Sequence, residues 1–493
     1  MSFIEMMTEK DAFTANGAIT NSTSHYYPLD LFFLAGACRR ESEDKIENVI
    51  TKSYAQDRVK TLKIIFWAGD IRQGAGERRF FKLALNWLYK YHREDLYQYL
   101  NYVPEFSRWD VLFDFVDDAK IMEYIITQFK EGNSLLCKWL PRKAKVTDKF
   151  KTEKTERHGK STTKVTLTKT KTREIKNGLA LKLRRALGWN EVQYRKHLVS
   201  HTNVVETKMC AKKWSDINYE HVPSVAMNKY NKAWYRNDET RFKQYLEDVK
   251  KGDKKINASA IFPHDIIKNA LQFNWNLEIH GLNEAQITQW NNLPNYLEGT
   301  VNQMIPVCDT SGSMYGLPIQ ICLALGLYIS ERNIGPFKDA FITFSGNPEM
   351  QVLKGDINQR MYQLARAEWG SNTNLNGVFE LILRKARAVN LPAEQMPKTI
   401  LVISDMEFDY CGELTNYETI KQAYHVSGYN CPNIVFWNVN GRAGNVPVTV
   451  NDQGVALVSG ASPSLIKAVL TGDIDPLNTM NSIIETERYS FIN

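Results

Sequence analysis

The sequence has no closely spaced cysteine pair, no leader-like start and no apolar run that could cross a bilayer. Its seven cysteines are odd in number and scattered, which predicts reduced thiols rather than a disulfide framework or a zinc site. Residues 1–13 carry four charged side chains and lack the basic start of a signal peptide. The most apolar window, 319–329, is about half as long as a membrane span. We therefore expect a cytoplasmic protein that does not enter a membrane.

Compositional bias is also absent from this chain of 493 residues. Glycine (27) and proline (16) are not enriched, and 43% of the residues are hydrophobic. These values exclude collagen-like, low-complexity and wholly disordered chains. The length predicts two or more domains.

The positive charge is distributed unevenly along the chain. Lys and Arg exceed Asp and Glu by 62 to 55 overall, but residues 1–300 carry a net charge of +12 and residues 301–493 a net charge of −5. The first region can attract a polyanion, whereas the second cannot do so through its net charge.

Residues 1–300 show mainly helical periodicity, which predicts an all-α domain. The pattern allows these helices to form an array of HEAT-like pairs. Apolar residues recur three and four positions apart in 54–67 and 80–91. Shorter helical stretches follow at 109–116, 121–129, 194–198 and 240–249. The segment 138–185 holds 17 basic and 4 acidic residues. Its Lys/Thr-rich part, about 145–178, is predicted to be a mobile basic insertion, with a projecting β-hairpin as the alternative.

Residues 301–493 are expected to form an α/β Rossmann-like domain. Short apolar runs at 304–308, 340–344, 399–404, 434–439 and 455–458 alternate with amphipathic stretches. This alternation predicts a parallel sheet with helices on both faces. Ligands of such sheets bind at the carboxyl ends of the strands.

Five oxygen-bearing residues fall at three of those strand ends and loops. Asp309, Ser311 and Ser313 follow the first strand in an Asp-x-Ser-x-Ser pattern, Thr373 lies in a later loop, and Asp405 follows the run 399–404. Carboxylates and hydroxyls are ligands for Mg²⁺, with Ca²⁺ or Mn²⁺ as alternatives. The simpler interpretation is that Asp-x-Ser-x-Ser caps the helix that follows.

These residues resemble the metal-ion-dependent adhesion site of von Willebrand factor A domains. The resemblance implies that Ser311, Ser313 and Thr373 bind the ion, while Asp309 and Asp405 hold it directly or through water. In that family the ion keeps an open position for an acidic residue of a partner protein. A metal that only braces the domain is the alternative.

The two-part plan also resembles Ro-type ribonucleoproteins, and plant and viral proteins that have a helical TROVE domain before an A domain. The likeness rests on the order of segments at 70–79, 103–110, 138–142, 187–196 and 261–265. It implies a helical ring at 1–300, an A domain at 301–493, and binding of small structured or misfolded RNA. The A domain would close the ring or recruit partners.

Basic residues near the insertion are the candidates for RNA contacts, because they can neutralise phosphates. They are Arg142, Lys143, Arg184, Arg185, Arg195, Lys196, His197, Lys208, Lys212 and Lys213. Aromatic residues lie among them, but Trp189 and Tyr194 are expected in the core. Any one basic residue could equally belong to a solvated helix face.

Two other functional classes remain open. A metal-dependent protein-interaction scaffold, viral or phage in origin, would bind an acidic partner and show no specific RNA binding. An enzyme is not expected, because no nucleophile–base order or zinc spacing is present. A metal-dependent nuclease is the one catalytic alternative.

Overall fold

A computed structural model of the chain describes residues 12–142, 178–268, 270–274, 276–298, 303–344, 346–367, 373–410, 415–470 and 474–493. The predicted basic insertion therefore lies almost wholly outside the described residues, as does Lys143. Within these ranges, no helix is both long and apolar enough to cross a membrane. The six cysteines inside them are free thiols.

The chain forms two compact units. Residues Met1–Lys90 and Tyr219–Asn493 make up one, here named the sheet unit, and Tyr91–Asn218 make up the other, the helical unit. The units do not follow the predicted division at residue 300, because the first 90 residues pack with the C-terminal sheet.

The helical unit consists of short helices. Its elements are α6 (Arg93–Gln98), η1 (Leu100–Tyr102), α7 (Val103–Phe106), η2 (Trp109–Phe115), α8 (Ala119–Lys130), α9 (Ser134–Trp139), α11 (Glu191–His201), α12 (Val205–Cys210) and η3 (Trp214–Asp216). Residues 178–187 are also helical. In α8, Ile121, Ile125 and Phe129 recur every four residues and are fully buried. This spacing places one apolar face of the helix in the core.

The sheet unit begins with a small hairpin and four helices. They are β1 (Ala12–Phe13), β2 (Ile19–Thr20), α2 (Tyr27–Ala35), α3 (Glu43–Gln56), α4 (Arg58–Gly69) and α5 (Arg78–Tyr91). The helix predicted at 54–67 is interrupted at Asp57, which has an extended backbone. Its carboxylate accepts a hydrogen bond from the Lys60 backbone N–H at 2.9 Å. Asp57 thus starts α4 as an N-cap, and the prediction of one continuous helix is wrong.

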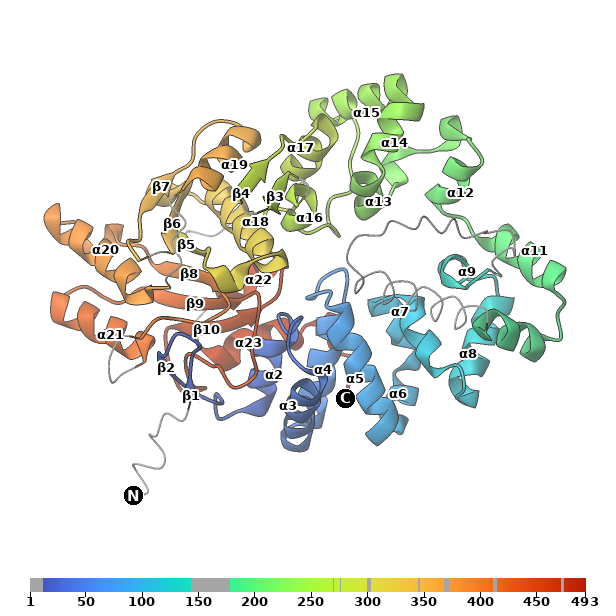
Figure 1. Ribbon diagram of the computed structural model, residues 1–493, viewed down its shortest axis with the longest axis horizontal. Coiled ribbons are helices and arrows are strands. Elements are labelled where there is room, and N and C mark those ends of the chain that lie inside the picture. Colours follow the sequence, from blue (N-terminus) through green and yellow to red (C-terminus); the bar gives the residue numbers. More distant parts are fainter. Residues whose placement is uncertain are drawn as a thin grey trace, which may run out of the picture. The chain divides into compact units, whose positions relative to one another are not determined.

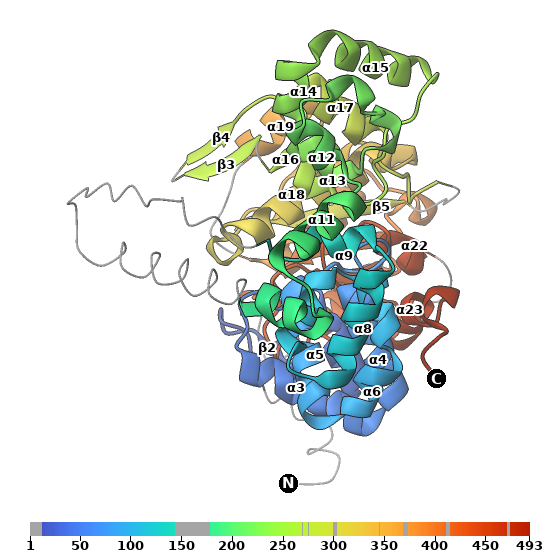
Figure 2. The ribbon, with the colours of Figure 1, turned by 90° about the vertical axis from the view of Figure 1, so that its right-hand side faces the viewer.

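Further helices and a second hairpin precede the large sheet. They are η4 (Tyr219–His221), α13 (Ser224–Lys229), α14 (Asn231–Asn237), α15 (Glu239–Lys251), α16 (Pro263–Ile267), β3 (Leu271–Asn274), β4 (Asn276–Ile279) and α17 (Glu284–Asn291). The antiparallel hairpin β3–β4 is separate from the large sheet (Figure 2). With β1–β2 it corrects the all-α prediction for residues 1–300, because both hairpins are too short to give a strong alternating pattern.

The large sheet has six strands in the order β10-β9-β8-β5-β6-β7. The strands are β5 (Met304–Asp309), β6 (Ala340–Phe344), β7 (Met350–Val352), β8 (Thr399–Ser404), β9 (Asn433–Asn438) and β10 (Val455–Ser459). All neighbours are parallel except β6 and β7. The five predicted strands are confirmed to within one residue. The edge strand β7 was not predicted, since its three residues form no buried run.

Helices pack on both sides of this sheet (Figure 1). They are α18 (Leu317–Arg332), α19 (Ile357–Arg366), α20 (Leu375–Ala388), α21 (Asn416–Ser427), α22 (Leu465–Leu470) and α23 (Pro476–Ile484). Short 3-10 turns complete the unit: η5 (Gly312–Met314), η6 (Gly335–Phe337), η7 (Ala393–Gln395) and η8 (Glu487–Tyr489). The α/β prediction for residues 301–493 is confirmed in this coarse form.

Helix α2 ends against the carboxyl ends of β9 and β10. The Gly36 backbone N–H donates to Ser459 Oγ at 3.0 Å, and the Gly441 N–H donates to Ala37 O at 2.9 Å. A Cβ atom at Gly36 would lie 2.5 Å from Ser459 O. Only glycine therefore permits this approach. The contact carries the N-terminal segment to the edge of the sheet at which ligands bind.

A buried ion pair ties the chain's last residues to the turn between α4 and α5. Asp70 is fully buried, and its carboxylate accepts hydrogen bonds from the Arg488 guanidinium, one of them at 2.8 Å, and from Tyr489 Oη at 3.2 Å. This turn is the glycine-containing segment 70–79 of the sequence. Its carboxylate has a structural role in the sheet unit.

Candidate metal centre

The predicted ligands lie where the strand order of the sheet reverses. Strands β5 and β8 are neighbours, although β6 and β7 separate them in sequence. Asp309 is the last residue of β5, and Asp405 immediately follows β8. In open α/β sheets this switch point is the usual ligand site. The two carboxylates therefore occupy the place where the fold binds ligands.

Asp309 is held within its own loop and by the next strand. Its carboxylate accepts a hydrogen bond from the Ser311 N–H at 2.9 Å and one from Ser404 Oγ at 2.5 Å. The capping interpretation of this loop is wrong, because the N-cap of α18 is Gly316, which makes no side-chain cap. The loop is thus free to serve another purpose.

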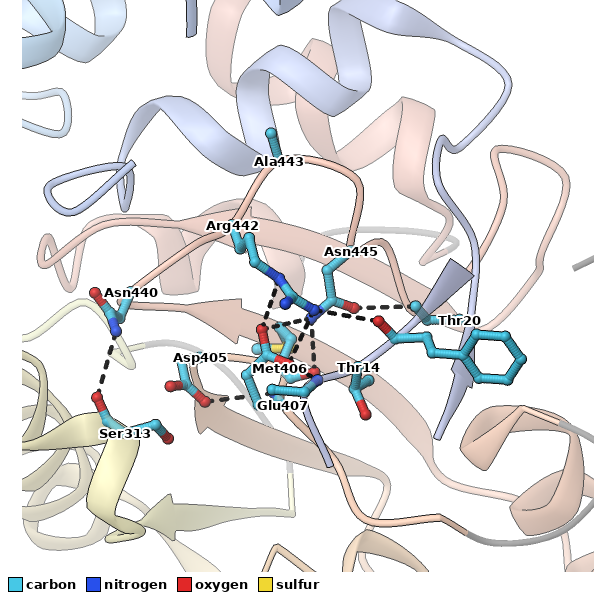
Figure 3. Close-up of polar contacts among 12 residues, drawn as sticks. Thr14, Thr20, Ser313, Asp405, Met406, Glu407, Asn440, Arg442, Ala443 and Asn445 are labelled. Carbon is cyan, nitrogen blue, oxygen red and sulfur yellow. Dashed lines mark hydrogen bonds and ion pairs between the residues drawn. The ribbon is translucent and has the colours of Figure 1, made fainter. Parts of the chain in front are cut away.

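Two serine hydroxyls and Asp405 complete the first part of the site. Ser311 Oγ and Ser313 Oγ are 3.0 Å apart. The Asp405 carboxylate is buried and accepts from the Glu407 N–H at 3.4 Å (Figure 3). Four of the five predicted ligands thus belong to two adjoining loops.

The electrostatics of this group favour a cation. Burial and the nearby charge of Asp405 raise the pKa of Asp309. Burial also raises the pKa of Asp405, against hydrogen bonds from Ser313 and Asn440. Across the described ranges, no lysine, arginine or histidine forms an ion pair with either carboxylate. Buried carboxylates are stable when a positive charge pairs with them, and a divalent ion would supply that charge.

Thr373 is held against the segment that follows Asp405. The fully buried Thr373 hydroxyl donates to Glu407 O at 2.6 Å and lies 3.1 Å from Asp409 Oδ1. Its backbone N–H donates to Asp409 Oδ2 at 2.9 Å. Within the described residues, Thr373 thus contacts Glu407, Asp409 and Asn16, and none of the other four predicted ligands. Carboxylates and hydroxyls are the oxygen donors that the five predicted ligands offer. This set fits Mg²⁺, Ca²⁺ or Mn²⁺ and does not fit zinc or copper.

No pattern in the sequence marks the N-terminal residues that contact these loops. Asn16 Nδ2 donates to Thr373 Oγ1 at 2.9 Å and to Glu407 O at 2.8 Å. From the loop between α2 and α3, Arg40 Nη1 donates to Ser313 O at 3.0 Å. More than 270 residues separate each pair in sequence, so no local pattern could have related them.

The candidate RNA-binding residues lie in the helical unit, with differing exposure. Arg142, Arg185, Arg195, Lys196, Lys212 and Lys213 are exposed. Arg184 lies 3.6 Å from Glu191, and Lys208 Nζ donates to Asp216 O at 2.9 Å. These two side chains therefore have partners within the unit.

His197 is half-buried and has partners within the helical unit. Its Nε2 is 2.6 Å from Phe129 O, and its ring packs against Phe129, Trp189 and His201. These contacts give His197 a packing role, and an RNA contact at this residue stays a prediction. Tyr194 is buried, with its hydroxyl donating to Pro141 O at 3.1 Å, which agrees with its expected core position.

Two family models match this chain. A family model described as a domain of unknown function, DUF2828, matches residues 14–109 and 111–301. The chain belongs to the DUF2828 family. A second domain of unknown function, DUF7788, matches residues 303–488 and so covers the large sheet.

Two similar proteins accompany the DUF2828 match. The uncharacterized protein L728 of Acanthamoeba polyphaga mimivirus is 27% identical over 514 residues, covering 96% of this chain and 87% of that protein. The crystal structure of the Deinococcus radiodurans RO (RSR) protein is similar at a TM-score of 0.37 and 14% identity, covering 93% of this chain and 99% of that one.

Proposed function

We propose that this protein binds RNA through its helical unit and a divalent cation, most simply Mg²⁺, at the switch point of its sheet unit. The observation that carries the RNA proposal is the division of charge. The helical unit contains 26 Lys and Arg against 16 Asp and Glu, whereas the sheet unit contains 36 against 39. The net positive charge of the chain thus comes from the helical unit, which is where a polyanion would be attracted.

One face of α11 presents two of these basic residues on a defined surface. Arg195 and Lys196 are exposed, and Val192 and Val199 on the same face are 60% and 59% exposed. Residues spaced by three, four and seven positions share one side of a helix. Basic groups can neutralise phosphates, and neighbouring apolar groups can contact unstacked bases. The resemblance of the sequence to Ro-type proteins supports small structured or misfolded RNA as the ligand.

The cation proposal rests on the Asp309 and Asp405 carboxylates. With Ser311, Ser313 and Thr373 they offer only oxygen ligands, and the ion would offset two buried negative charges. A bound ion with few protein charges around it attracts a carboxylate. We propose that the site binds an acidic side chain of a partner protein or braces the three loops.

A filter-binding assay across a salt series tests the RNA proposal. We expect affinity for a 3′-tailed structured RNA that falls as salt rises, and weaker binding by Arg195→Glu/Lys196→Glu. The matched control is Lys243→Glu/Lys251→Glu, which makes the same charge change on α15 of the sheet unit. Equal losses in both variants, or no salt-dependent binding, would contradict the proposal.

One observation, the pair of buried carboxylates at Asp309 and Asp405, favours the alternative of a metal-dependent protein-interaction scaffold. That alternative gives no role to the basic helical unit. It predicts cation-dependent capture of an acidic peptide and RNA binding no tighter than that of other basic proteins. We propose binding rather than catalysis. Intact labelled RNA after incubation with Mg²⁺ is the expected result, and cleavage that requires Asp309 would show a nuclease instead.

A further inference from the structure

The N-terminal hairpin lies against the loops that carry two of the proposed ligands. This segment, residues 12–21, is named the strap. Thr14 Oγ1 donates to Phe408 O at 2.7 Å, and Gly17 forms an isolated antiparallel bridge with Asp409. The strap therefore pairs with the chain directly after Asp405. Both belong to the sheet unit.

A carboxylate anchors the tip of the strap. Glu407 accepts a hydrogen bond from the Ala15 backbone N–H. Arg442 Nε lies 3.1 Å from Glu407 Oε1, and Arg442 Nη2 donates to Phe13 O at 3.2 Å. Figure 3 shows Glu407 and Arg442 side by side, close to Thr14 and Asp405. The strap is thus fixed at a residue two positions from a proposed ligand.

The other end of the strap is fixed by a different loop, at Asn445 and Val446. Thr20 Oγ1 lies 3.0 Å from Asn445 Oδ1, and Asn21 Nδ2 donates to Val446 O at 3.0 Å. Asn445 Nδ2 in turn donates to Met406 O at 3.0 Å. Two ends with separate anchors allow a variant at one end to be compared with a variant at the other.

Asn16 is the residue of the strap that reaches a proposed ligand. The Thr373 hydroxyl has one proton, which the carbonyl of Glu407 accepts at 2.6 Å. Asn16 Nδ2 donates to the same hydroxyl oxygen and to the same carbonyl. Asp409 Oδ1, 3.1 Å from the hydroxyl oxygen, is a second acceptor beside the same proton. The bond from Asn16 leaves one lone pair of the hydroxyl oxygen for a further partner.

We infer that the strap is a built-in part of the cation site, and that Asn16 is a positioning residue for the Thr373 ligand. The inference rests on the proposed cation site and goes beyond it, because it assigns N-terminal residues to ion binding. If docking of the strap favours the ion, then the ion must favour docking by the same factor. If the strap were undocked, the Thr373 hydroxyl would lose the hydrogen bond from Asn16 that helps to orient it.

The test measures Mn²⁺ affinity of the full chain from the electron paramagnetic resonance signal of free Mn²⁺. We expect Asn16→Ala to weaken binding about fivefold, because it removes the hydrogen bond from Nδ2 to Thr373 Oγ1 together with the one to Glu407 O. The control Asn21→Ala removes one hydrogen bond from the distal anchor and should leave the affinity within about twofold. Hydrogen exchange should also show that Mg²⁺ slows exchange of the Ala15 amide in the wild type and not in Asp309→Ala.

The outcomes separate this inference from the proposed function. Mn²⁺ binding by the wild type with equal affinities in Asn16→Ala and Asn21→Ala would overturn the inference and leave the cation site standing. Absence of Mn²⁺ binding in the wild type would overturn both. Weaker Mn²⁺ binding by Asn16→Ala than by Asn21→Ala, together with slowing of the wild-type Ala15 amide by Mg²⁺, supports both.

Discussion

The two units of this protein use charged residues in opposite ways. In the sheet unit the carboxylates of Asp309, Asp405 and Asp70 are buried, each 2% exposed or less. In the helical unit the candidate residues Arg185, Arg195 and Lys196 are exposed. Buried charges require exact partners and so define a compact site, whereas exposed charges act together on a polyanion. Single substitutions of charged residues should therefore have large effects in the sheet unit and small effects in the helical unit.

The largest expected effect is loss of the cation response. Asp309→Ala should abolish the rise in thermal stability that Mg²⁺ gives the wild type, because the ion loses a ligand that lies at the switch point. Thermal denaturation with and without Mg²⁺ measures this. In the helical unit, Arg185→Ala should keep the full rise in thermal stability with Mg²⁺. An equal loss of that rise in Arg185→Ala would contradict the contrast between the two units.

Arg488→Ala should be the most destabilising single change of those considered. It leaves the fully buried Asp70 carboxylate without its guanidinium partner, which costs about 3 kcal/mol. Urea denaturation gives the change in the free energy of unfolding. The control is Lys182→Ala, which breaks an exposed pair with Asp117 in the helical unit and should cost about 0.5 kcal/mol or less. Similar losses in both variants would contradict the contrast between the units.

These predictions depend on features that the sequence revealed to different degrees. Buried strands such as β5 and β8 have uninterrupted apolar runs, so their ends, and with them Asp309 and Asp405, were predictable. The strap was not predictable, because its two strands have two residues each. The residues of the sheet unit that it contacts, such as Phe408, lie almost 400 positions away in the sequence. The packing of His197 against Phe129 was not predictable either, because a basic neighbourhood in sequence does not show which side of α11 faces Phe129.

The next largest expected effect is a pH dependence of the stability of the sheet unit. Burial lowers the pKa of His264 to about 4, below its value of about 6.5 in an unfolded chain. The folded protein therefore keeps His264 neutral, while the unfolded chain takes up a proton. Stability from this residue is present above pH 6.5 and is lost as the pH falls toward 4, by about 2 kcal/mol at pH 5.

His264→Leu is the variant that isolates this contribution. Urea denaturation at pH 7.5 and at pH 5 should show a smaller loss of stability in the variant than in the wild type. An unchanged pH dependence would mean that His264 is not the group responsible. The helical unit offers His201 as a control, since His201→Leu should leave the pH dependence of the sheet unit intact.

The smallest expected effects are those of single basic residues in the helical unit. Arg195→Ala or Lys196→Ala should each weaken RNA binding several-fold and reduce the slope of log affinity against log salt by about 0.7 for a single-stranded contact. Filter binding at four salt concentrations measures both quantities. His197→Ala should destabilise the helical unit through lost packing and leave the salt slope unchanged. A change of slope at His197 would return it to the RNA-binding set.

The most direct test of the central claim is a map of ultraviolet crosslinks between the full chain and a 3′-tailed structured RNA. Mass spectrometry of the crosslinked peptides locates the contacts. We expect crosslinks concentrated in residues 138–218, including the peptide that carries Arg195 and Lys196, and retained in Asp309→Ala. Crosslinks confined to the sheet unit, or a crosslink yield no higher than that of an unrelated basic protein, would contradict it.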